Sequence, residues 1–153
     1  MIPALTAYYL RMKYLQFKPP IDPVTIARDE GYEVLFSDFG GVYGTALGFI
    51  DIYDNVIYVN KSADPQTQSY VIAHELGNSI FNRHTDWARL GNAVYWDRDI
   101  RNRKHNARNR IAREFALGLI APRGMVRNYA DRVPSEDLSK LFGVPNKFLT
   151  SRI

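Results

Sequence analysis

The sequence contains no cysteine, which excludes disulfide bonds, cysteine catalysis and thiolate-bound zinc. Only three of its 153 residues are histidine, so a metal site would depend on histidine, carboxylate or weakly binding amide ligands. No apolar run approaches the roughly 18 residues that a membrane-spanning helix needs. The first residues also lack the charged-then-apolar order of a signal peptide. These absences predict a cytoplasmic protein with no membrane partner.

The composition is that of a folded globular domain. Apolar residues make up 46% of the chain and charged residues 24%, which argues against intrinsic disorder. A chain of this length can bury roughly 68–70% of its unfolded surface, enough for a real core. We therefore expect one domain over residues 1–153, with an N-terminal helix and linker at 1–20, a core at 21–122 and C-terminal helices at 123–153.

Acidic residues are scarce in one segment, 98–113, where Asp99 is the single acid among seven basic residues. A solvated helix face or loop would explain this pattern, and so would a docking surface for an acidic partner or a phosphate backbone. Tyr95 and Trp96 precede the segment, and arginine and aromatic residues dominate interface hot spots. The candidate partner-binding residues are Arg98, Arg101, Arg103, Lys104, Arg108 and Arg110.

The pattern of helix and strand signals predicts an α+β fold. Asp-Pro pairs at 22–23 and 64–65 are typical of helix starts, and the second opens a long helix from 65 to about 83. A second buried helix is predicted at 107–120, with further helices within 1–17, at 135–142 and from 146 onward. Strands are predicted at 32–36, 46–51 and 55–60, the last two forming a hairpin. Because strands and helices are segregated, we expect a small three-stranded antiparallel or mixed sheet.

The segment from Val71 to Asn78 contains a His-Glu pair, His74 and Glu75, in an apolar helical context. In an HExxH motif the two histidines lie four residues apart on one helix face, so both imidazoles reach one zinc ion. The glutamate then takes a proton from metal-bound water. Here Asn78 occupies the position of the second histidine, and its carboxamide is a poor zinc ligand.

Several other segments resemble the ImmA/IrrE family of zinc metallopeptidases. The stretch 55–60 is similar to the family's strand ending in asparagine, and 112–122 (AREFALGLIAP) resembles its second helix, A-N-x-F-A-x-x-L-L-M-P. Residues 138–145 (LSKLFGVP) resemble its closing segment, and 21–27 fit its opening. The resemblance implies a zincin-like pair of core helices under the sheet. It covers most of residues 21–153, in order and at consistent spacing.

The resemblance also implies which metal ligands are missing. The family's third zinc ligand, a glutamate on the second helix, corresponds to Asn109, and the asparagine or aspartate four residues later corresponds to Arg113. His74, Asn78 and Asn109 are thus the remnant ligand positions, with Glu75 a vestigial general base. A carboxylate is lost and a guanidinium gained, and both changes disfavour Zn²⁺. A relocated site that recruits His84 or His105 is the alternative.

Family members commonly act on helix-turn-helix repressors of phages and mobile elements. The resemblance therefore implies a degenerate regulatory protein, of antirepressor or toxin–antitoxin type, that binds such a repressor and needs no cofactor. The alternative is an active zinc-dependent endopeptidase that cleaves the repressor. A third possibility, direct DNA binding by residues 134–153, is disfavoured because Phe142, Val144, Phe148 and Leu149 are typical of helices that pack on a domain.

Overall fold

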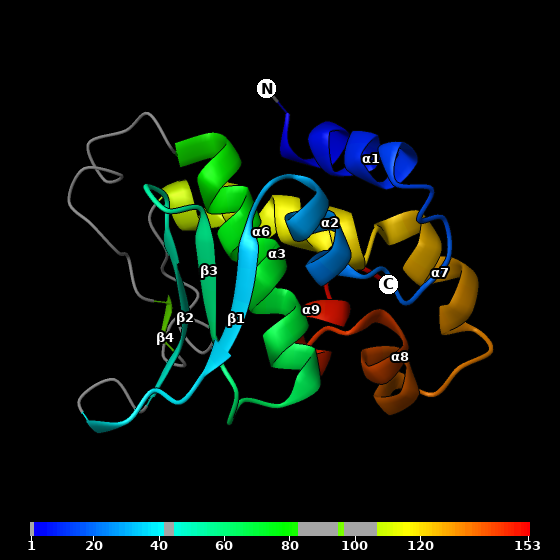
Figure 1. Cartoon of the computed structure of the whole chain (residues 1–153). Helices are drawn as coiled ribbons and strands as arrows, with labels where there is room; N and C mark the ends of the chain where they lie inside the picture. Colours follow the sequence, from blue (N-terminus) through cyan, green and yellow to red (C-terminus); the bar gives the residue numbers. More distant parts are fainter. Residues whose placement is uncertain (1, 42–44, 83–94, 97–106) are drawn as a thin grey trace.

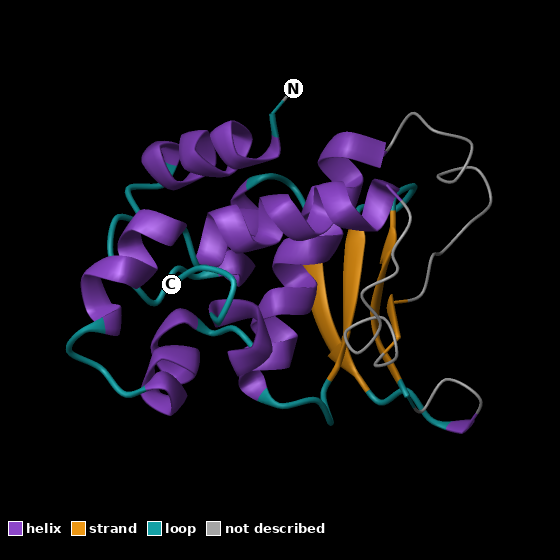
Figure 2. Cartoon of the chain, turned by 180° about the vertical axis from the view of Figure 1, so that it is seen from behind, coloured by secondary structure: helices purple, strands orange, loops and turns teal. Residues whose placement is uncertain are grey.

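The structure is a computed structural model that describes residues 2–41, 45–82, 95–96 and 107–153 (Figure 1). Its α+β architecture confirms the predicted class. The sheet contains β1 (Glu33–Ser37), β2 (Ala46–Asp51), β3 (Val56–Asn60) and β4 (Tyr95–Trp96). The helices are α1 (Pro3–Lys13), α2 (Pro23–Asp29), α3 (Pro65–Asn82), α6 (Ala107–Ile120), α7 (Arg123–Ala130), α8 (Ser135–Phe142) and α9 (Asn146–Leu149). Both views place these helices on one side of the sheet (Figure 2).

The sheet is mixed, with strand order β1-β3-β2-β4. β2 and β3 form the predicted antiparallel hairpin, and β1 pairs with β3 in parallel, from Glu33 opposite Val56 to Ser37 opposite Asn60. The two-residue β4 adds a short antiparallel edge beside β2, which the three predicted strands did not include. β3 is therefore a central strand, and four of its five residues are buried.

Aspartate caps begin two of the helices where the sequence predicts them. The Asp22 carboxylate accepts hydrogen bonds from the backbone N–H groups of Val24 and Thr25, and the Asp64 carboxylate accepts one from Thr67. Each cap satisfies amide groups that have no partner inside the helix. The Asp64 cap fixes the start of α3, which runs along the sheet and packs against α6. The core therefore forms around this pair of helices, as the resemblance implies.

The C-terminal helices pack into the same core. Leu138, Phe142, Val144, Phe148 and Leu149 are all buried, as expected for helices that dock on the domain. α7 was not predicted; it begins after Pro122 and buries Val126 in the core. In the part of the chain that the structure describes, every helix is too short or too polar to cross a bilayer.

Candidate functional site

Helix α3 carries the residues of the incomplete zinc motif. His74, Glu75 and Asn78 are all almost fully buried in the middle of this helix. Positions 74 and 78 are four residues apart, so both side chains emerge on the same helix face. The sequence prediction of their helical placement is correct, and their burial shows that this face looks into the protein.

Asn78 interacts directly with the glutamate of the motif. Its amide nitrogen Nδ2 donates a hydrogen bond to Oε2 of Glu75 at 3.2 Å. The residue in the position of the second histidine therefore contacts the carboxylate of the motif. This pair provides a polar contact inside the core, in which the amide donates and the carboxylate accepts.

Aromatic side chains surround His74, and sequence reasoning did not single them out. The Tyr70 hydroxyl lies 3.5 Å from Nδ1 of His74, and the Tyr70 ring stacks on Phe148 of α9 with centroids 4.5 Å apart. The guanidinium of Arg113 lies 5.2 Å from the centroid of the Phe148 ring. Tyr70 precedes His74 by one helical turn, which is a local signal that could have been used, whereas only the fold brings Phe148 to this place.

The second core helix approaches α3 closely at Gly77. A Cβ atom at this glycine would lie 2.8 Å from Cδ1 of Phe115 and 3.2 Å from the carbonyl oxygen of Ala112. The half-buried Asn109 lies three residues before Ala112, about one helical turn along α6. The predicted remnant ligands are thus carried by two helices in direct contact, and their convergence on one point stays a prediction.

The predicted partner-binding residues fall mostly outside the described residues. Arg98, Arg101, Arg103 and Lys104 lie there, as do the two alternative metal ligands His84 and His105. Arg108 belongs to the first turn of α6, and Arg110 is exposed on the same helix. The described part of the basic segment therefore leads directly into the helix that carries Asn109.

Positive charge also gathers farther along α6. Arg152, near the end of the chain, is buried, and its Nη1 atom lies 3.9 Å from Oε2 of Glu114. Burial lowers the pKa of Arg152, the Glu114 carboxylate opposes this shift, and Arg123 and Arg113 add to it. Arg113, Arg123 and Arg152 therefore lie close enough to interact where α6 meets the C-terminal segment, and Glu114 opposes their effect on Arg152.

The side chains at the ligand positions do not fit a zinc ion. They provide one imidazole from His74 and two neutral carboxamides from Asn78 and Asn109, whereas zinc prefers imidazole, thiolate and carboxylate donors. Among the described residues, no three histidine, aspartate or glutamate side chains form a group that could hold a metal ion. Arg113 contacts Phe148, whose ring stacks on Tyr70, and Tyr70 in turn neighbours His74.

Comparison with known proteins identifies the scaffold. The model of the Peptidase_M78 family, described as the IrrE N-terminal-like domain, matches residues 27–153. No curated protein matches the chain. The match spans all four strands and both core helices, and it includes His74 and Glu75. The chain therefore belongs to the Peptidase_M78 family of IrrE N-terminal-like domains, whose scaffold is that of a zincin-like metallopeptidase.

Proposed function

We propose that this protein is a catalytically degenerate ImmA/IrrE-like regulator that controls a helix-turn-helix repressor of a phage or mobile element by binding it. Family membership supports the regulatory setting. The observation that carries the degenerate assignment is the pair of carboxamides, Asn78 and Asn109, at two of the three ligand positions. Asn78 also donates a hydrogen bond to Glu75. This hydrogen bond ties the would-be general base to the residue that replaces a metal ligand.

The chemistry of the motif explains why peptide hydrolysis is disfavoured. A catalytic zinc ion supplies a water whose pKa is lowered to about 7, and three protein ligands normally hold that ion. With Asn78 and Asn109 in place of a histidine and a glutamate, His74 is the one strong donor of the three.

Regulation by binding alone is sufficient to relieve repression. A protein that binds a repressor state unable to hold DNA shifts the repressor population toward that state. The size of this shift is limited by how much more tightly the regulator binds one repressor state than the other. The surface through which the regulator contacts the repressor therefore determines how far repression is relieved. We assign this surface to the basic segment Arg98–Arg110, because its charge would attract an acidic face and accelerate the encounter.

Metal content tests the degenerate assignment. Protein purified without added zinc should contain well under one zinc per chain, because two ligand positions carry carboxamides. The double variant Asn78→His/Asn109→Glu should then take up about one zinc per chain, since it restores a three-ligand set. Adding His74→Ala to that variant is the matched control and should abolish the uptake. One zinc per chain in the natural protein, lost in His74→Ala alone, would refute the degenerate assignment and favour the peptidase alternative.

The regulatory role has a separate test. Glu75→Gln removes the only carboxylate of the motif and should leave the effect on the repressor unchanged, measured as repressor release from its operator. Intact repressor on a gel after release would support binding, whereas cleavage products that disappear in Glu75→Gln would support proteolysis. Failure of the protein to bind any helix-turn-helix repressor would refute the partner class.

A further inference from the structure

Helix α1 is apolar on two opposite faces. Its inner face buries Ala7 and Leu10, and Gly118 of α6 lies directly beneath Ala4 and Ala7. Its outer face exposes a stripe at helical spacing i, i+3, i+4 and i+7. The exposed fractions are 63% for Leu5, 51% for Tyr8, 61% for Tyr9 and 44% for Met12. A helix that is apolar all round is normally buried, so this outer stripe calls for a covering surface.

The apolar surface extends beyond the helix itself. Ile2, Leu15 and Phe17 are also at least half exposed, which brings the set to seven large side chains within the first 17 residues. At roughly 100 Å² each, given that a buried aromatic removes about 150–250 Å² from water, they present about 700 Å². A monomer rarely exposes a continuous patch beyond a few hundred Å². Taken together, the α1 stripe and the three side chains at the ends of the helix approach the roughly 800 Å² per partner of a standard stable interface.

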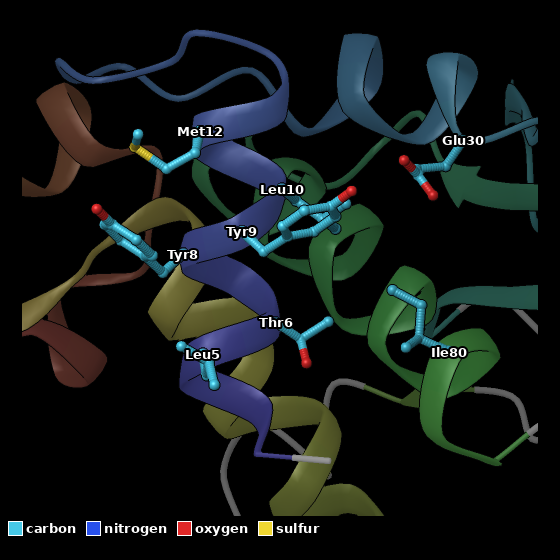
Figure 3. Close-up of a pocket in the computed structure, with 8 residues that line it drawn as sticks. All are labelled: Leu5, Thr6, Tyr8, Tyr9, Leu10, Met12, Glu30 and Ile80. Carbon is cyan, nitrogen blue, oxygen red and sulfur yellow. The ribbon is translucent and has the colours of Figure 1, made fainter.

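A groove runs along one flank of the stripe. It has a volume of about 630 Å³ and lies between α1 and two residues of neighbouring helices, Glu30 and Ile80. Leu5, Tyr8, Tyr9 and Met12 all line it, and Figure 3 shows Tyr9 projecting from α1 toward the Glu30 and Ile80 side. The α1 surface therefore combines a ridge of side chains with a hollow that these side chains line. Two helices pack together when the ridge of one fits into a groove of the other.

We propose that two copies of this chain dimerise through α1, packed antiparallel about a two-fold axis between Tyr8 and Tyr9. The stripe is nearly symmetric about that midpoint, because aromatic residues occupy the centre and the aliphatic Leu5 and Met12 occupy the ends. Two-fold packing requires such self-complementarity: each Leu5 faces the Met12 of the partner subunit.

Charge also favours the antiparallel arrangement. Arg11 and Lys13 both lie at the C-terminal end of α1, and its first turn carries no acid. Lys13 is paired with Glu30 at 2.6 Å, so the charge that matters here is that of Arg11. Parallel packing would bring the two Arg11 side chains together, whereas antiparallel packing keeps them at opposite ends of the interface. α1 precedes the family-matched residues 27–153, so the stripe itself lies outside that match, and dimerisation through it needs neither zinc nor a repressor.

Sedimentation measures the dimer directly. The 17.6 kDa chain should sediment at twice that mass at concentrations of about 10–100 μM, in the range of a micromolar dimer. Tyr9→Glu places two unpaired carboxylates at the centre of the interface and should weaken association at least about 100-fold. Tyr53→Glu, at a 72% exposed tyrosine in the turn between β2 and β3, is the matched control and should remain dimeric.

Two results would overturn the proposal. One is that the natural chain stays monomeric at about 100 μM. The stripe would then be assigned to binding an amphipathic helix of another protein. The other is a dimer that Tyr9→Glu does not weaken, which would place the interface elsewhere. Circular dichroism of Tyr9→Glu establishes that the loss of association is not a loss of folding.

Disulfide trapping tests the orientation, because the chain has no cysteine of its own. In the antiparallel pair, residue 5 faces residue 12, whereas two copies of residue 5 are about 10 Å apart along the axis, beyond the ~7 Å reach of a disulfide. A mixture of Leu5→Cys and Met12→Cys should therefore cross-link under mild oxidation, and each variant alone should not. Cross-linking of each variant with itself, but not of the mixture, would reject the antiparallel arrangement.

Discussion

Gly77→Ala probes the contact that sets the spacing of the two core helices. In an exposed helix, replacing glycine by alanine stabilises a protein by about 0.5–1 kcal/mol. At Gly77 the added Cβ would lie 2.8 Å from Cδ1 of Phe115 and 3.3 Å from Cα of Ala112. Carbon atoms at rest are about 3.5–4.0 Å apart, so the helices must separate or the ring must move. Phe115 is fully buried, and Ala112 contributes backbone, so neither yields easily.

The expected result is a net loss of stability. Overpacking a core costs typically 1–3 kcal/mol, which outweighs the gain in helix propensity and leaves a destabilisation of about 1–2 kcal/mol. Urea unfolding should show a lower midpoint, and the melting temperature should fall by about 2–8 °C. Gly124→Ala is the matched control, because Gly124 lies in α7 with nothing within 4 Å of an added Cβ, and it should be neutral or slightly stabilising. If both variants gained stability equally, the close approach at Gly77 would be wrong.

Two further predictions concern pH and partner binding. Burial raises the pKa of Glu30, but hydrogen bonds from Lys13 at 2.6 Å and Tyr14 at 2.5 Å outweigh it and hold that pKa below its ordinary value of 4.5. The ionised Glu30 carboxylate therefore stabilises the folded state above pH 4.5, and this stabilisation is lost as the pH falls through the lower pKa that Glu30 has in the folded protein. Glu30→Gln should be less stable than the natural protein at pH 7, and the difference in unfolding free energy should vanish in acid; a difference that persisted there would contradict the assigned interactions. Separately, changing Arg101, Arg103 and Lys104 to serine should weaken repressor binding and flatten its salt dependence, and unchanged affinity across a salt series would remove the basic segment from the interface.

Local signals in the sequence were enough to place most helices and the hairpin. Asp22-Pro23 and Asp64-Pro65 each combine a capping carboxylate with a proline in the first helical position, and both helices begin there. Such signals act over a few residues, so they do not depend on the rest of the fold. The i, i+4 spacing of His74 and Asn78 likewise fixes their common helix face before any tertiary contact forms.

Tertiary structure decided what surrounds that face. The parallel pairing of β1 with β3 and the short strand β4 join segments whose sequences do not specify their partners. α7 has no capping side chain, and burial of Val126 in the core stabilises this helix. The stack of Arg113, Phe148 and Tyr70 beside His74 forms because α9 folds back onto α3 and α6, about 70 residues away from the motif in sequence. Residues far apart in sequence meet only when burial of apolar surface closes the chain, so local patterns identify the motif residues and the packing determines their neighbours.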